Sequence, residues 1–258
     1  MFLPALVSGV WGLAVMLLKR RPTRSQMLLG LTLLLVAFAA AMLGVFFRGR
    51  AGSLFIYDFV FEITAVLCAP MYYVGICALV EPRGATLRQR QVFLVPLLFI
   101  VGLTAGAFWL GPRRYEMMCH ALRESGGFVG WMAGDAAWNY MYFWDHWLFP
   151  ALMLAGGFVL IAMSSRKVRD YQARFNSLYA DNIDLPPVNN RELSVLTWIF
   201  VPLGVIVVLM IDLRPHYYKY WLIMCSVLLT VVQYLIGRFV WRLDYDARYL
   251  AKYIRIKN

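Results

Sequence analysis

The chain has few charged residues for its length. Asp, Glu, Lys and Arg make up 15% of its 258 residues, whereas hydrophobic residues make up 62% and the mean hydropathy is +0.64. A soluble domain carries roughly a quarter charged residues, because its surface faces water. The composition therefore excludes an ordinary soluble domain and indicates that lipid surrounds most of the chain.

Cysteine is also scarce, with four in the whole chain. Cys68, Cys77 and Cys225 lie in apolar stretches, where a cysteine usually packs as a small hydrophobic residue. Only Cys119 falls in a more polar connection. The sequence therefore gives no sign of a disulfide framework.

Motifs of known catalytic and metal chemistry are absent. The sequence contains no GxSxG, no HExxH and no phosphate-binding loop, and its three histidines lack the spacing of metal ligands. Tyr57-Asp58 and Gly134-Asp135 resemble the paired aspartates of intramembrane aspartyl proteases, but Met132 stands where the second motif needs glycine. We therefore expect no enzyme activity, no metal site and no other cofactor.

Long apolar stretches dominate what the sequence does contain. A helix needs about 20 mostly apolar residues to cross a bilayer. Seven stretches meet this condition approximately, at 2–18, 27–47, 54–80, 92–111, 141–163, 193–212 and 219–241. The predicted fold is all-α, a polytopic membrane bundle of seven transmembrane helices over residues 1–241, followed by a tail at 242–258.

The distribution of basic residues predicts the orientation. When the connections are assigned alternately to two sides, 18 of the 25 Lys and Arg residues fall on one side, which marks it as cytoplasmic. The N-terminus is then outside and the C-terminus inside, in a bacterial inner membrane. The same bias accounts for most of the net charge of +11 and favours contact with anionic lipid over nucleic-acid binding by this chain.

Two acids interrupt the third apolar stretch near its outer start. Asp58 and Glu62 are four residues apart, so they share one face of a helix. An acid inside a span is costly unless it faces the bundle interior or a wet cavity. An alternative stays open, in which Asp58 only reaches the headgroups and Glu62 bonds a neighbouring backbone group or hydroxyl.

Other ionisable groups gather on the same side of the predicted membrane. Asp145 and His146 lie near the outer start of the fifth span, whereas the inner halves of the spans contain no acid or histidine. This asymmetry favours a pocket open to the outside over a proton relay through the midplane. The predicted ligand-binding residues are Asp58, Glu62, Trp144, Asp145, His146 and Asp212.

Two connections and the tail are long enough to have structure of their own. The external loop 112–140 is rich in Trp and Tyr, which predicts a segment across the bundle mouth or, alternatively, a simple aromatic belt. The cytoplasmic loop 164–192 begins with a basic helical pattern and breaks at Pro186-Pro187. The sequence of the tail, residues 242–258, predicts a helix that lies along the inner leaflet or on a partner protein. The alternative is a frayed, solvated chain end.

Proline recurs inside the predicted spans. A proline within a helix removes a hydrogen bond and produces a kink. Such kinks predict pivots for a conformational switch, although proline is also an ordinary constituent of membrane helices. The prolines concerned are Pro70, Pro96, Pro150 and Pro202.

Two segments resemble a known family. Residues 67–102, LCAPMYYVGICALVEPRGATLRQRQVFLVPLLFIVG, resemble the third and fourth spans of the membrane-embedded sensory region of Bacteroidetes-type transcription regulators. Residues 166–200 are similar to the basic helix and return helix that follow the fifth span there. That family places a cytoplasmic AraC-type helix-turn-helix domain after its spans, and related proteins a histidine-kinase output. This sequence ends at DYDARYLAKYIRIKN without such a domain, so the resemblance implies either a truncated product or signalling through a partner.

Composition, charge and resemblance together predict a membrane sensory or signalling module. It would detect a small external ligand or the state of the envelope and transmit it to a cytoplasmic output domain or partner protein. The alternative is a small-solute transporter or permease, which needs no ionisable relay when its substrate is neutral. Membrane lipid is an expected partner, and a homodimer stays open.

Overall fold

Apolar stretches of this length fold as helices because a helix satisfies its own backbone hydrogen bonds in lipid. The computed structural model describes residues 2–48, 54–81, 86–124, 131–179 and 218–243, together with Trp198. In these ranges the regular elements are helices and none is a strand. Most of the predicted sixth span, Asp212, the turn at Pro186-Pro187 and the tail beyond residue 243 lie outside the described residues.

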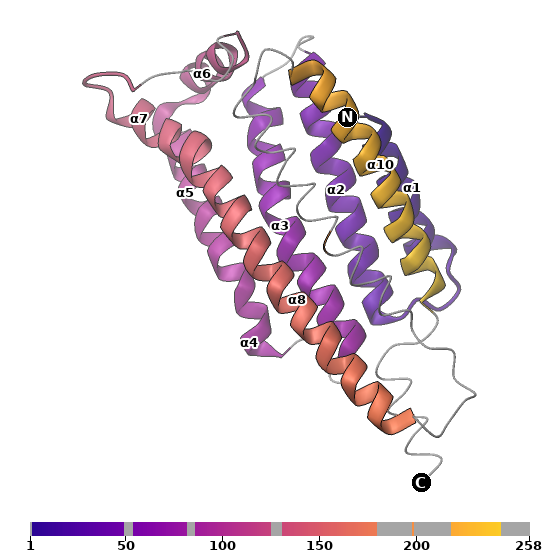
Figure 1. Cartoon of the computed structure of the whole chain (residues 1–258). Helices are drawn as coiled ribbons and strands as arrows, with labels where there is room; N and C mark the ends of the chain where they lie inside the picture. The colour runs from indigo at the N-terminus through magenta and orange to yellow at the C-terminus, as the bar shows by residue number, and fades with distance from the viewer. Residues whose placement is uncertain are drawn as a thin grey trace.

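The long helices run along a common direction and alternate in sense (Figure 1). The elements are α1 (Phe2–Leu13), η1 (Ala14–Leu18), α2 (Arg24–Arg48), α3 (Leu54–Val80), α4 (Leu87–Arg90), η2 (Gln91–Phe93), α5 (Leu94–Leu110), α6 (Pro112–Glu124), α7 (Ala136–Tyr142), η3 (Phe143–Leu148), α8 (Phe149–Tyr179) and α10 (Tyr218–Arg242). After the first helix, α2 and α3 form a hairpin. Two short helical turns then lead into α5, α6 lies at one end of the bundle, and α8 is the longest of the described helices.

Four helical segments of the described chain are long and apolar enough to cross a membrane. They are Arg24–Phe46, Leu54–Val80, Leu87–Leu110 and Ala136–Tyr171. The apolar helix Phe2–Leu18 is shorter than these four. The all-α prediction is therefore confirmed, and the described residues contain four segments that could span a membrane.

Large apolar side chains cover the outside of the bundle. On α5, Leu98 is 68% exposed, Val101 66% and Phe108 83%. A soluble protein would bury such a surface, whereas in a bilayer lipid tails cover it. In contrast, α3 is central: it packs against α2, α5, α6 and α8, and most of its side chains are buried.

The first and last described helices lie side by side (Figure 1) and are tied at one end. Lys19 Nζ donates to the carbonyl oxygen of Trp241 at 2.8 Å, and Gln26 Nε2 donates to that of Val240 at 2.9 Å. The Gln26 side chain also accepts a hydrogen bond from the backbone N–H of Thr23, the residue directly before α2. These bonds satisfy carbonyls that a helix C-terminus otherwise leaves without partners.

Two of the predicted proline sites follow turns that are not α-helical. A proline ring clashes with the carbonyl of the residue four positions earlier. For Pro150 that residue is His146, inside the π-helical turn η3, and for Pro96 it is Val92, inside the 3-10 turn η2. Local departures from α-helical geometry are frequent at such prolines. Pro70 lies within α3, and Pro202 lies outside the described residues.

The predicted loops contain more helix than their names suggest. The segment 112–140 contains α6 and the start of α7. Residues 164–179, the first part of the predicted loop 164–192, continue α8 without a break, with Val168 buried against the main apolar core and Tyr171 packed partly against it. The amphipathic spacing of that segment therefore extends a membrane helix beyond its apolar part.

Candidate functional site

The acids of α3 lie at the end of the bundle where this helix begins. Glu62 is buried, with 1% of its surface exposed, and Asp58 is half-buried one turn earlier. Asp58 Oδ2 accepts a hydrogen bond from the Tyr115 hydroxyl at 3.1 Å, and Cys119 Sγ lies 3.8 Å from the same oxygen. Tyr115 and Cys119 both come from α6, so this helix supplies donors to Asp58 of α3.

A third acid fixes α6 to the start of α3. The carboxylate of Glu116 accepts the backbone N–H groups of Leu54 at 2.8 Å and Phe55 at 3.1 Å. An anion is favourable there, since the first N–H groups of a helix lack intrahelical partners and carry partial positive charge. His120 lies 3.5 Å from Glu116 on the next turn of α6.

The electrostatics of α6 reflect the concentration of acids around it. Burial raises the pKa of the Tyr115 phenol well above its usual range, and the charges of Asp58, Glu62 and Asp145 raise that pKa further. Burial, followed by the charge of Asp58, likewise raises the pKa of the Cys119 thiol. Both groups therefore stay protonated near neutral pH and act as donors.

The fourth acid comes from the π-helical turn η3. Asp145 lies near enough to Tyr115 and Cys119 for its charge to act on both side chains. Single π-helical turns inside α-helices are frequent at functional sites. We call Asp58, Glu62, Glu116 and Asp145 the acidic cluster; its members come from α3, α6 and η3.

The other predicted site residues of η3, Trp144 and His146, pack against aromatic rings. His146 stacks on Tyr142 at 5.0 Å between ring centroids, with an interplanar angle of 19°. Trp144 packs against Phe99 of α5 at 5.5 Å, and a Cβ on Gly102 would lie 2.1 Å from its ring. Trp144 is thus part of the contact between η3 and α5, while Asp212 lies outside the described residues.

The start of α7 is fixed by a separate set of polar contacts. Asp135 caps α7 by accepting from the Trp138 N–H at 3.1 Å, and it also forms an ion pair with Arg114 of α6. Met132 and Asn139 exchange two hydrogen bonds across the turn that precedes the helix. This set holds α6 and α7 together beside the acidic cluster.

Sequence reasoning located the acids of α3 and η3 but missed the contribution of α6. The aromatic content of 112–140 predicts an interfacial segment or belt, and neither Tyr115 nor Glu116 is among the predicted ligand-binding residues. The available signal is that Tyr115, Met118 and Cys119 recur at helical spacing. These three side chains are fully buried, whereas Arg113 and His120 on the same helix are exposed. Such a stripe predicts an amphipathic helix that lies on the bundle.

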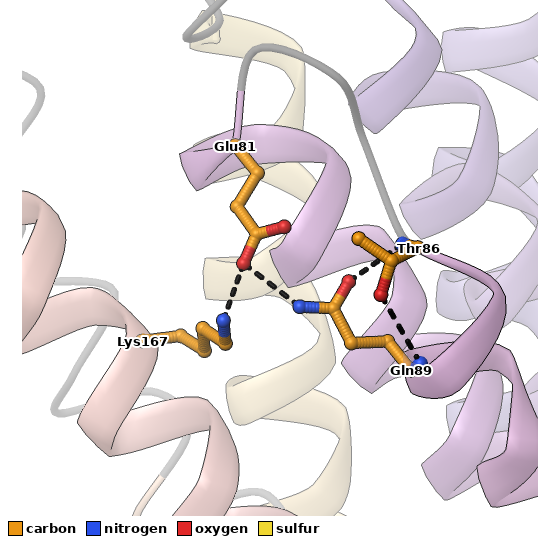
Figure 2. A network of polar contacts seen from close by, with 4 residues as sticks. All are labelled: Glu81, Thr86, Gln89 and Lys167. Carbon is orange, nitrogen blue, oxygen red and sulfur yellow. Dashed lines mark hydrogen bonds and ion pairs between the residues drawn. The ribbon is translucent and has the colours of Figure 1, made fainter.

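The opposite end of the bundle has a different polar network, which Figure 2 shows. Glu81, directly after α3, forms an ion pair with Lys167 of α8 and accepts from Gln89 Nε2 of α4 at 2.8 Å. Gln89 in turn accepts from the backbone N–H of Thr86 at 2.7 Å, and the Thr86 hydroxyl caps α4. We call these four residues the α3–α8 junction.

Exposed arginines surround the α3–α8 junction. The acids of the described chain at this end are Glu81 and Asp170, so positive charge predominates there. The exposed arginines are Arg20, Arg21, Arg24, Arg88, Arg90, Arg166, Arg169, Arg238 and Arg242. The bundle therefore has an acidic end and a basic end.

A cavity of about 440 Å³ lies between the helices, with walls from α2, α3, α5, α8 and α10. Its lining is apolar apart from a few groups such as Gln233, which is 1% exposed. Within the described ranges, no group of three His, Cys, Asp or Glu side chains is arranged to hold a metal ion. Comparison with family models, curated proteins and solved structures returns no match.

Proposed function

We propose that the chain is a sensory or signalling module of the bacterial inner membrane, which detects an external ligand or the state of the envelope. One observation carries this proposal. Acids of α3, α6 and η3 lie at one end of the bundle, while α8, continuous with η3, extends as a helix past the other end (Figure 1). One continuous helical segment thus connects the candidate ligand site to the opposite side.

The proposed orientation places the acidic end outside and the basic end in the cytoplasm. Basic residues are retained on the cytoplasmic side of membrane proteins and attract anionic lipid. The exposed arginines of α2, α4, α8 and α10 support this assignment. The N-terminus is then external and the C-terminus cytoplasmic.

The helix ends also support seven spans. α8 ends at the basic end, and α10 ends there too, because Lys19 and Gln26 hold its last carbonyls. The start of α10 is therefore at the acidic end, opposite the end of α8. The apolar residues 193–212 of the sequence are long enough for one further span, which the seven-span proposal requires.

The proposed mechanism is a shift between two packings of the bundle. A ligand changes their populations only if it binds the two packings with different affinity. The acidic cluster suits a cationic or proton-donating ligand, because it contains four carboxyl groups with buried donors around Asp58. The output would be a new pose of the cytoplasmic part of α8, read by a partner protein or an AraC-type or kinase output, with no nucleic-acid contact by this chain.

A proton is the simplest ligand that the acidic cluster can bind, so external pH is a suitable probe. We expect a fluorophore on Ala173→Cys, an exposed position near the end of α8, to change its emission when external pH falls from neutral to mildly acidic. The protein is reconstituted in liposomes with a buffered lumen. Glu62→Gln and Asp58→Asn keep shape and hydrogen bonding, and should abolish the response.

Asp170→Asn, an exposed change at the basic end, serves as the matched control and should respond like the unmodified protein. If Glu62→Gln and Asp58→Asn both assemble normally and respond unchanged, the acids are structural and the ligand site is withdrawn. A trapped pH dye distinguishes the alternative function, since net proton entry into the lumen would favour a transporter.

A further inference from the structure

The α3–α8 junction joins the two helices that also meet at the acidic cluster. α3 carries Asp58 and Glu62 near its start and is followed directly by Glu81. The helix formed by α7, η3 and α8 carries Asp145 near its start and Lys167 beyond its apolar part. The two helices pack against each other between these points, so a relative movement at one end has to be accommodated at the other.

At the junction, Glu81, directly after α3, binds side chains of both α4 and α8. The Glu81 carboxylate receives Lys167 from α8 and Gln89 from α4 on the same oxygen, Oε1 (Figure 2). The Lys167 side chain is 32% exposed and that of Glu81 22%, so water screens the pair only in part. The capping box between Thr86 and Gln89 fixes the side chain of Gln89 in position.

An apolar cluster lies under the polar contacts. Tyr73, Val74 and Cys77 of α3 pack with Leu160 of α8, and Phe93 and Met163 contact them. Beyond the junction, α8 continues from Lys167 to Tyr179, and Ala173 on this part is exposed. The junction therefore lies close to the point where α8 leaves the bundle.

We propose that Glu81, Lys167 and Gln89 form a latch that holds the cytoplasmic part of α8 against the end of α3, and that its release is the step that changes the pose of this part. The inference rests on the proposed sensory function for its trigger. The latch itself is a property of the unliganded protein. Glu81 and Lys167 act here as positioning residues.

The test measures the distance between spin labels on Leu87→Cys of α4 and Ala173→Cys of α8, both exposed positions. The protein is in liposomes, with the native cysteines replaced by alanine or, at Cys119, by serine. The unmodified junction should give one narrow distance distribution. Glu81→Gln and Lys167→Met should each add a longer distance, raising the ratio of released to latched molecules about fivefold, as expected for losing a partly buried ion pair.

Exchange of the two charges provides the decisive control. The double variant Glu81→Lys with Lys167→Glu restores an ion pair between α3 and α8 and should return the narrow distribution. Arg169→Gln, an exposed neighbour of Lys167, should leave the distribution unchanged. Gln89→Ala, which keeps the ion pair, gives a milder form of the same loss if Glu81→Gln fails to assemble. Unaltered distances in Gln89→Ala, Glu81→Gln and Lys167→Met would overturn the latch.

The same labels separate failure of the latch from failure of the sensory function. If the junction variants release α8 but external pH never moves the labels of the unmodified protein, the sensory function fails and the latch stands. If the unmodified protein responds to pH and Lys167→Met responds to the same extent, the junction does not carry the signal and the latch is overturned, whereas the sensory function stands.

Discussion

At the scale of single residues, the acidic end depends on donors that remain protonated. The Tyr115 hydroxyl donates to Asp58 because burial and three nearby acids keep the phenol neutral. Cys119 contributes from the next turn of α6 under the same influence. A carboxylate at this depth is tolerated because such donors replace part of its lost hydration.

The state of Cys119 gives a prediction about reactivity. A thiol reacts as its thiolate, and the raised pKa of Cys119 keeps the thiolate fraction low as pH rises through the range in which a free cysteine ionises. Maleimide labelling of Cys119 should therefore be slow in the folded protein and increase little between neutral and mildly alkaline pH. A cysteine introduced at Met117, exposed on the same helix, should react at least about tenfold faster.

Mass spectrometry of the labelled peptides measures both rates in one sample. Equal labelling of Cys119 and of the cysteine at position 117 would show that α6 does not pack on α3. Labelling of Cys119 after addition of SDS confirms that the thiol is intact.

At the scale of elements, the contact of α7 and η3 with α5 depends on two glycines. Gly102 and Gly106 are four residues apart on α5, a spacing of small residues that lets membrane helices approach closely. Trp144 lies over Gly102 and Tyr140 over Gly106, and the Tyr140 hydroxyl donates to the Gly102 carbonyl at 3.2 Å. The position of η3, and with it that of Asp145, follows from this contact.

Gly102→Ala should therefore destabilise the protein. Its Cβ would lie 2.1 Å from the ring of Trp144, which has to move, at a cost of about 1–3 kcal/mol in the free energy of unfolding. Gly156→Ala in α8 is the matched control, because nothing lies within 4 Å of a Cβ there. The control should be neutral or stabilising by up to about 1 kcal/mol, since alanine is the better helix former.

Unfolding in SDS, followed by circular dichroism, measures both variants. Equal stability of Gly102→Ala and Gly156→Ala would contradict the close contact between η3 and α5.

At the scale of the whole molecule, the bundle is polarised. Acids gather where α3 begins, arginines gather where it ends, and apolar side chains cover the surface between. This arrangement supports the proposed orientation and separates the candidate input from the candidate output.

The proposed orientation predicts which cysteines an impermeant reagent can reach. Trp131→Cys, 61% exposed at the acidic end, should react in intact cells, whereas Leu87→Cys, 81% exposed at the basic end, should react only after the membrane is opened. Labelling is detected by a mass shift on gels. Reversed accessibility would invert the orientation and remove the outward-facing ligand site.

The sequence by itself determined the helical membrane class and the approximate bounds of the long helices, because lipid leaves an apolar backbone few alternatives to a helix. It also located Asp58, Glu62 and Asp145, since an acid in an apolar stretch is conspicuous. The exact helix ends were harder to predict. α4 and η2 precede α5 because Thr86 caps α4, and α8 continues to Tyr179 because Val168 is buried, so both helices extend into polar sequence.

Only the tertiary structure decided which side chains meet. Glu116 caps α3 from 61 and 62 residues away, and Lys167 reaches Glu81 across 86 residues. The direction of a side chain on η3 also depends on its π-helical turn, which points Trp144 toward α5 and His146 onto Tyr142. Helical periodicity predicts a face of one helix, but the partner of that face is set by how all the helices pack, and packing depends on shapes and charges that are far apart in the sequence.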